Sequence, residues 1–261
     1  MKKYIKQYFD FRSSLKNKVA VITAGGGHLC SVFALALVNL GCKVIIVDIR
    51  EKKLIDIKKK INNKNLIFYT CNLLNKYDVD KLSLQIYKKF KKIDILINGV
   101  GINSPKKFEQ ISKSDWNTVF ESHLLSTLFG CQSFGKYMKK KNKGSIINIS
   151  SASAGPPLSK AFAYSAAKAG IKNLTQNLAR EWAKYNIKVN CIRPGFFPTK
   201  WNEKNFLDKK RVKKIMEHTP MKRFGKPIEL SGAIIWLSSD SSSFVTGSEI
   251  VIDGGFSCMT I

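Results

Sequence analysis

The sequence has few histidines, few acidic residues and few arginines, and these shortages exclude several classes of protein. Its three His and six scattered Cys residues form no C-x-x-C pair and no metal-ligand spacing, so we expect no metal site. The cysteines stand mostly in apolar stretches, which favours free thiols and a cytoplasmic location. No apolar run approaches the roughly 20 residues of a membrane-spanning helix. The opening stretch, rich in Lys and aromatics, lacks the apolar segment of a signal peptide.

The charge of the chain is strongly unbalanced. Lys and Arg number 45 against 18 Asp and Glu, which gives a formal net charge of +27. Such an excess can indicate nucleic-acid binding, because clustered cations neutralise phosphates. Here only six of the cations are Arg, the side chain best suited to phosphate recognition, and the Lys residues are spread over every segment. We therefore expect neither a nucleic-acid partner nor a membrane partner.

Short apolar runs rich in Val and Ile recur along the chain and predict a parallel sheet of about seven strands. Continuous apolarity over a few residues is typical of strands that helices cover on both faces. The expected strands are residues 19–23, 43–48, 66–69, 93–98, 144–150, 187–192 and 248–253.

Stretches with helical periodicity alternate with these strands. Such alternation, with right-handed crossovers, predicts a doubly wound Rossmann-type α/β fold. We expect one domain over residues 16–261 after an N-terminal extension of residues 1–15. The least regular segment, about 194–221, predicts a lid over a substrate. The expected helices are residues 29–40, 51–62, 77–91, 114–139, 160–184 and 226–239.

A glycine-rich turn, AGGGHLC at residues 24–30, joins the first predicted strand to a helix. In this context the backbone can approach a pyrophosphate at the positive helix N-terminus. Asp48 ends the second strand, where its carboxylate can accept hydrogen bonds from an adenosine ribose and would repel a 2′-phosphate. These features predict NAD as the cofactor, with NADP less favoured, although the nearby Arg50 weakens the preference.

The stretch AFAYSAAKAG, residues 161–170, places Tyr164 and Lys168 on one face of a predicted helix. A buried ammonium beside a phenol stabilises the phenolate, so we expect the pKa of Tyr164 to fall below its ordinary value of about 10. Tyr164 would then act as a general acid or base. Ser151 follows a predicted strand at its carboxyl end, where α/β folds bind ligands, and can hydrogen-bond the same substrate oxygen.

With these motifs in this order, the chain from about Lys16 onward resembles the short-chain dehydrogenase/reductase family. The family's glycine loop falls on residues 23–30, its N-N-A-G turn on NGVG at 98–101, and two further motifs on RPGFFPT and SFVTGSEIVIDGG. The resemblance implies an NAD(H)-dependent oxidoreductase that interconverts a secondary alcohol and a ketone, assembled as a homotetramer or homodimer. TAGGGHLC and RPGFFPTKWN are most similar to the branch with D-mannonate oxidoreductase (fructuronate reductase) and gluconate 5-dehydrogenase, which implies a sugar acid or polyol as the small-molecule substrate.

The resemblance also implies a set of site residues. It assigns catalysis to Ser151, Tyr164 and Lys168, with His123 in the proton relay. It assigns cofactor contacts to Gly25, Gly26, Gly27, His28, Leu29, Asp48, Asn72, Leu73, Asn98, Gly99, Tyr164, Lys168, Pro194, Gly195, Phe197 and Thr199. Expected substrate contacts are Ser153, Lys200, Trp201 and Asn202, with Arg193 nearby to meet a carboxylate.

Several positions depart from the family pattern. Ala24, His28 and Cys30 replace loop glycines, and His123 stands where the family has Asn. A histidine can relay protons, so we expect activity with a changed pH profile; the alternative is a core His and an impaired relay. Two other functions stay open. One is a 3-oxoacyl thioester reductase that docks an acidic carrier protein, and the other is a catalytically silent NAD-sensing or RNA-binding protein.

Overall fold

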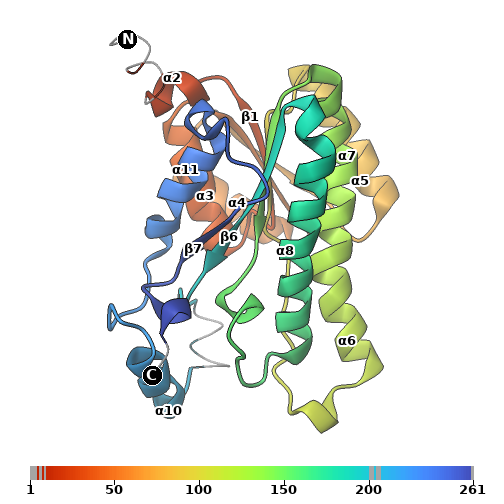
Figure 1. Cartoon of the computed structure of the whole chain (residues 1–261). Helices are drawn as coiled ribbons and strands as arrows, with labels where there is room; N and C mark the ends of the chain where they lie inside the picture. The colour runs from red at the N-terminus through yellow and green to blue at the C-terminus, as the bar shows by residue number, and fades with distance from the viewer. Residues whose placement is uncertain (1–4, 6–7, 9, 200–202, 204–206, 260–261) are drawn as a thin grey trace.

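Seven parallel strands form the centre of the fold in the computed structural model, which describes residues 5, 8, 10–199, 203 and 207–259 (Figure 1). Their order in the sheet is β3-β2-β1-β4-β5-β6-β7, and each neighbouring pair is parallel. The predicted sheet is confirmed. The strands are β1 (Val19–Thr23), β2 (Lys43–Asp48), β3 (Leu66–Thr70), β4 (Ile95–Asn98), β5 (Gly144–Ile149), β6 (Ile187–Pro194) and β7 (Glu249–Ile252).

The strand order reverses between β1 and β4, and helices cover both faces of the sheet (Figure 1). A reversal of this kind opens a crevice at the carboxyl ends of the strands, where α/β proteins bind ligands. One face packs against α3 (His28–Asn39), α4 (Glu51–Ile61) and α11 (Ser231–Ser238). The other packs against α5 (Lys76–Phe90), α7 (Ser126–Lys141) and α8 (Phe162–Trp182).

The helix predicted over residues 114–139 is divided by a π-helical turn. It consists of α6 (Lys113–Phe120), the turn η2 (Glu121–Leu125) and α7. Side-chain hydroxyls bond the carbonyls of this turn, from Ser126 to Ser122 O at 2.6 Å and from Thr127 to His123 O at 2.7 Å. Periodicity alone does not show this change of pitch, and π-helical turns frequently mark functional sites.

The N-terminal segment and the predicted lid each contain a short helix. Helix α2 (Phe11–Leu15) buries Leu15 completely in the core, and the Ser14 hydroxyl accepts a hydrogen bond from Asp240 N. The predicted lid, residues 194–221, contains α10 (Lys209–Glu217). None of the helices in the described ranges is long and apolar enough to cross a membrane.

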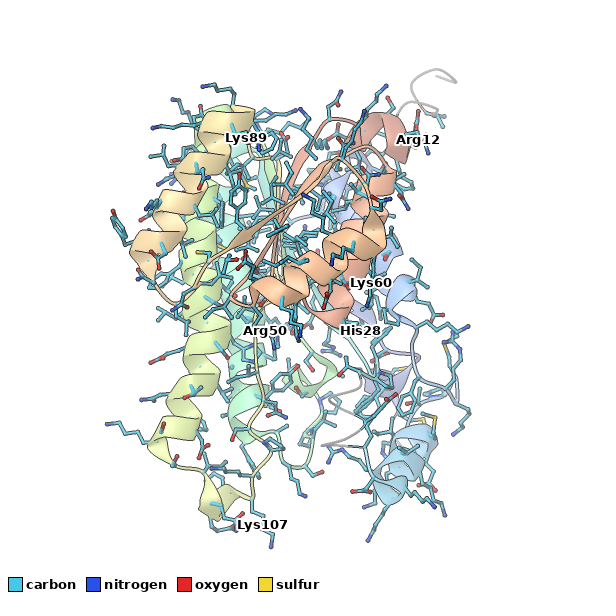
Figure 2. All side chains as sticks on the ribbon, turned by 180° about the vertical axis from the view of Figure 1, so that it is seen from behind. Arg12, His28, Arg50, Lys60, Lys89 and Lys107 are labelled. Carbon is cyan, nitrogen blue, oxygen red and sulfur yellow. The ribbon has the colours of Figure 1, made fainter. Side chains whose placement is uncertain are left out.

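Basic side chains are spread over the surface rather than gathered at one place. The labelled Arg12, Lys60, Lys89 and Lys107 lie far apart on the molecule (Figure 2). Several lysines lie over aromatic rings, such as Lys139 Nζ at 5.3 Å from the Trp182 ring centroid. This distribution matches the even spread of Lys along the sequence.

Candidate active site

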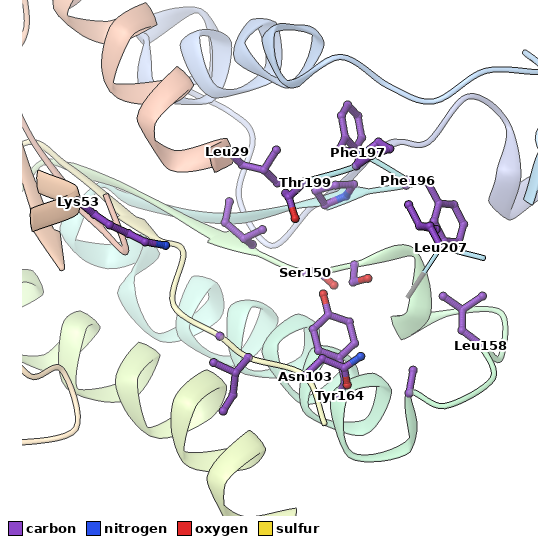
Figure 3. Close-up of a pocket in the computed structure, with 18 of the residues that line it drawn as sticks. Leu29, Lys53, Asn103, Ser150, Leu158, Tyr164, Phe196, Phe197, Thr199 and Leu207 are labelled. Carbon is purple, nitrogen blue, oxygen red and sulfur yellow. The ribbon is translucent and has the colours of Figure 1, made fainter. Parts of the chain in front are cut away.

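A cavity of about 640 Å³ lies at the carboxyl ends of the central strands (Figure 3). Seven predicted site residues line it: Leu29, Ser151, Tyr164, Pro194, Gly195, Phe197 and Thr199. The glycine turn and Asp48 lie at the end of the cavity that Arg50 and Lys53 line. Figure 3 shows the labelled Lys53 far from Tyr164, so the cavity has two distinct ends.

The glycine turn leaves space that side chains would fill. A Cβ atom at Gly25 would overlap Ile46, and one at Gly26 would lie 2.9 Å from Lys53 Cβ and 3.0 Å from Asp48 Oδ2. Gly27 caps α3, so the first N–H groups of that helix face the turn. Ala24 takes the left-handed φ of 52° in a loop where the resembled family has glycine. This geometry suits a pyrophosphate held by backbone donors.

Asp48 presents a buried acceptor beside this turn. Its carboxylate is 4% exposed, and Oδ1 accepts from the backbone N and Nε of Arg50 at 3.0 and 3.4 Å. Oδ2 is buried and has no hydrogen-bond partner within the described ranges. An unpaired buried carboxylate oxygen calls for a donor. The hydroxyls of an adenosine ribose would supply one, so the residues present fit a dinucleotide.

Tyr164 and Lys168 project from α8, one turn apart. Lys168 Nζ donates to Ile149 O at 2.5 Å and lies 5.7 Å from the centre of the Tyr164 ring. Lys168 is 4% exposed, and burial lowers its pKa to about 8. Ser151 follows β5, and its hydroxyl accepts from Ser153 N at 3.2 Å and lies 3.1 Å from the Ser153 hydroxyl. These two contacts from Ser153 therefore fix the position of the Ser151 hydroxyl.

The expected depression of the Tyr164 pKa is wrong. Desolvation raises the pKa of Tyr164, and a hydrogen bond from Ser151 only partly opposes this effect. Removing a phenolate from water costs more free energy than the Ser151 hydrogen bond returns. Tyr164 is thus a protonated phenol at neutral pH.

His123 lies on the π-helical turn, under the loop that follows β4. It is 1% exposed, its Nε2 lies 2.8 Å from Ile102 O, and its ring meets the Tyr164 ring edge-on with centroids 5.2 Å apart. Burial and then the charge of Lys168 lower its pKa to about 3, so it is neutral at neutral pH. Because a carbonyl only accepts, Nε2 carries the proton and Nδ1 can only accept.

Other predicted residues lie away from the cavity. Asn98 Nδ2 donates to Asn148 Oδ1 at 2.9 Å, which gives Asn98 a structural contact between β4 and β5. Gly99 N donates to Thr23 Oγ1 at 3.0 Å. His28 is exposed, Asn72 Oδ1 accepts from Leu74 N in a turn, and Leu73 is in the core.

The expected carboxylate-binding role of Arg193 is also wrong. Its Nη1 pairs with Glu249 Oε2 at 3.1 Å, and Arg193 is not among the residues that line the cavity. Lys200, Trp201 and Asn202 lie outside the described residues. In the part of the chain that the structure describes, no group of three His, Cys, Asp or Glu side chains could hold a metal ion.

Sequence reasoning missed several residues of the lining. They lie on the segments that follow β4 and β5 or on the lid and include Gly101, Ile102, Asn103, Ser150, Leu158 and Leu207. The rule that pointed to Ser151, a polar residue at the carboxyl end of a strand, applies equally to Asn103 after β4.

Known proteins are similar to this chain along nearly its whole length. Residues 29–257 match the family model described as Enoyl-(Acyl carrier protein) reductase. An uncharacterized oxidoreductase, UxuB, of Bacillus subtilis is 36% identical, over 93% of this chain and 96% of its own. An NAD-dependent glycerol dehydrogenase of Listeria innocua is 32% identical, over 95% of this chain and 97% of its own. The structure of a gluconate 5-dehydrogenase from Burkholderia cenocepacia J2315 in complex with NADP and tartrate is similar to this one with a TM-score of 0.91 and 26% sequence identity. The match covers 97% of this chain and 99% of the other.

Proposed function

The chain belongs to the short-chain dehydrogenase/reductase family, whose members act on CH–OH groups, and from this premise we propose an NAD(H)-dependent dehydrogenase of a polyhydroxylated substrate. It would interconvert a secondary alcohol and its ketone. One observation carries the proposal: Tyr164 and Ser151 line the cavity whose other end adjoins the glycine turn and Asp48, and Lys168 lies one helical turn from Tyr164.

NAD is the cofactor that the nucleotide end favours. The unpaired Asp48 Oδ2 would accept from a ribose hydroxyl and would repel the 2′-phosphate of NADP. The Listeria relative is named as NAD-dependent. Arg50 and Lys53 line the same end, and the Burkholderia relative was solved with NADP, so we expect weak residual use of NADP.

The residues of the chain supply positioning and proton transfer. When bound, oxidised NAD supplies a nicotinamide carbon that takes the hydride, with two electrons, from the carbinol carbon. Ser151 donates a hydrogen bond to the substrate oxygen and orients it. Tyr164 exchanges the hydroxyl proton with that oxygen, as base in oxidation and as acid in reduction. Lys168 holds a positive charge nearby, which favours the Tyr164 phenolate, the form that accepts the alcohol proton in oxidation and remains after Tyr164 donates its proton in reduction.

The substrate class follows from the relatives. Glycerol and gluconate are the compounds named for two of them, and both carry several hydroxyl groups. We propose a sugar acid or polyol, with D-mannonate and fructuronate as a first pair to test. The complete Ser151, Tyr164 and Lys168 set argues against a catalytically silent protein.

The proposal is tested by following NADH absorbance with NAD⁺ and a panel of polyols, sugar acids and an acetoacetyl thioester. Tyr164→Phe should lower turnover by about 10²–10⁴-fold, because it removes the group that transfers the proton. NADH binding, measured by fluorescence, should persist in this variant. Tyr77→Phe, at a side chain 73% exposed, is the matched control. Full turnover in Tyr164→Phe would refute the assignment.

A further inference from the structure

The loop after β4 carries a polar side chain that the proposed reaction does not use. Asn103 lines the same cavity as Tyr164 and Ser151 (Figure 3). Its Oδ1 is buried and has no hydrogen-bond partner among the residues that the structure describes. Burying an amide oxygen without a donor costs free energy, so this atom calls for a donor from a ligand.

Two hydrogen bonds fix this loop relative to Tyr164. Ile102 N donates to Ser122 Oγ at 3.4 Å, and Ile102 O accepts from His123 Nε2 at 2.8 Å. Ser122 and His123 both belong to the π-helical turn, and the His123 ring packs edge-on against Tyr164. The π-helical turn therefore contacts both the loop and Tyr164, and Asn103 is the residue of the loop that follows Ile102.

The approach of the loop to His123 is unusually close. A Cβ atom at Gly101 would overlap the Cε1 of the imidazole ring. The loop can reach its position only because residue 101 is glycine. The position of Asn103 thus depends on the ring below it as well as on the two hydrogen bonds.

The other side chains at the substrate end leave few polar groups for recognition. Leu158 and Leu207 contribute apolar side chains there (Figure 3). The Ser150 hydroxyl is already bonded to Glu249 Oε1 at 3.2 Å. Ser151 and Tyr164 serve the reacting oxygen. Among the described residues that line this end, Asn103 carries a side-chain amide that can bind a second oxygen of the substrate.

We propose that Asn103 is a specificity-determining residue that accepts a hydrogen bond from a hydroxyl on the carbon next to the reacting carbon. His123 is a positioning residue that holds the Asn103 loop through Ile102 O. This inference rests on the proposed dehydrogenase function and narrows its substrate class to vicinal diols and the corresponding hydroxyketones. A substrate lacking the second hydroxyl would leave Asn103 Oδ1 buried and unpaired, and such sites discriminate strongly.

The experiment compares propane-1,2-diol with propan-2-ol, which differ by one hydroxyl next to the reacting carbon. The quantity measured is the ratio of kcat/KM for diol to monoalcohol with saturating NAD⁺. We expect this ratio to be above about 10 in the wild-type protein and to fall by about 10–100-fold in Asn103→Leu. Asn103→Ala gives the same test if the Leu variant does not fold. Lys107→Gln, on the exposed continuation of the loop, should keep the wild-type ratio.

His123→Phe retains a ring but loses the donor to Ile102 O. It should lower the same ratio, mainly by raising the KM for the diol, and leave the pH profile of kcat in place. A shifted pH profile with an unchanged ratio would assign His123 to proton transfer and overturn its positioning role.

An equal loss for both alcohols in Asn103→Leu, or a raised KM for NAD⁺, would overturn the assignment of Asn103. That result differs from a failure of the proposed function. If the wild-type protein binds NADH but oxidises no alcohol of the panel, the function and this inference fall together. If it oxidises both alcohols at the same kcat/KM, only the inference falls.

Discussion

At the scale of single residues, burial sets the protonation state of each ionisable group around Tyr164. Burial lowers the pKa of His123 to about 3 and that of Lys168 to about 8, and it raises the pKa of Tyr164. At pH 7 the imidazole and the phenol are therefore neutral and Lys168 carries the charge. Lys168 is thus the group that must favour the Tyr164 phenolate, which accepts the alcohol proton in oxidation, because the neutral His123 contributes no charge.

The neutral burial of His123 predicts a pH-dependent loss of stability. Its pKa in the folded state, about 3, lies below the ordinary value of about 6.5, so the unfolded chain takes up a proton that the folded chain excludes. This contribution is complete above pH 6.5 and is lost as the pH falls towards 3. At pH 4.5 the loss is on the order of 2 kcal/mol.

Urea denaturation at pH 7 and pH 4.5 measures this effect. Carboxylates also destabilise the fold in acid, so the comparison is between wild type and His123→Phe, whose drop between the two pH values should be smaller by on the order of 2 kcal/mol. His28→Phe, at an exposed His, should keep the wild-type drop. Equal drops in wild type and His123→Phe would contradict the prediction.

Asp48 should control the choice between NAD and NADP. Asp48→Asn keeps the size of the side chain but removes the charge that would repel a 2′-phosphate, while Arg50 and Lys53 remain at the same end of the cavity. We expect the ratio of kcat/KM for NADP⁺ to that for NAD⁺ to rise by about 10–100-fold, as for loss of one charge-assisted contact. Steady-state kinetics with both cofactors measure it. Asp56→Asn, exposed on α4, is the control and should leave the ratio unchanged.

At the scale of elements, a buried polar chain joins two central strands to α8. Asn98 Nδ2 donates to Asn148 Oδ1 at 2.9 Å, and Asn148 Nδ2 donates to Thr175 Oγ1 at 2.9 Å. The Thr175 hydroxyl then donates to Ile171 O at 2.7 Å within the helix. These bonds fix α8, and with it Tyr164, relative to the strand ends.

Thr175→Val should therefore destabilise the protein although it preserves shape. The substitution leaves the Asn148 amide without its acceptor in the core, which costs about 1–3 kcal/mol. Thr118→Val is a matched control, because Thr118 also bonds the carbonyl four residues earlier but is exposed, and it should change stability by less than about 0.5 kcal/mol. Denaturant unfolding of both variants measures the difference, and equal stabilities would exclude this role for the chain.

Periodicity predicted each sheet strand to within two residues at either end, because strands buried on both faces must be apolar throughout. It did not predict the π-helical turn at His123, since a change of helical pitch leaves the hydrophobic pattern almost intact. Spacing placed Tyr164 beside Lys168, but the desolvation that raises the Tyr164 pKa depends on the surrounding cavity. Arg193 was misassigned because its partner, Glu249, is 56 residues away in the sequence, on the neighbouring strand β7.

At the scale of the whole molecule, charge imbalance is the dominant electrostatic feature. With 45 cationic and 18 acidic residues, at least 27 cations (45 minus 18) have no acidic residue to neutralise them. Existing ion pairs are mostly at the surface, such as Lys106 with Asp115 at 2.7 Å, and contribute little. The net effect on the folded state is self-repulsion, which is stronger in the compact chain than in the unfolded one.

Added salt should therefore stabilise this protein. The screening length falls from about 30 Å at 0.01 M to about 8 Å at 0.15 M, so repulsion across the molecule is largely removed over that range. We expect Tm to rise by about 3–6 °C, which corresponds to roughly 1–2 kcal/mol for a chain of this size. Sodium and potassium chloride should act equally, since screening depends on ionic strength alone. A fall in Tm on adding either salt would mean that attractive ion pairs outweigh the repulsion between the unpaired lysines.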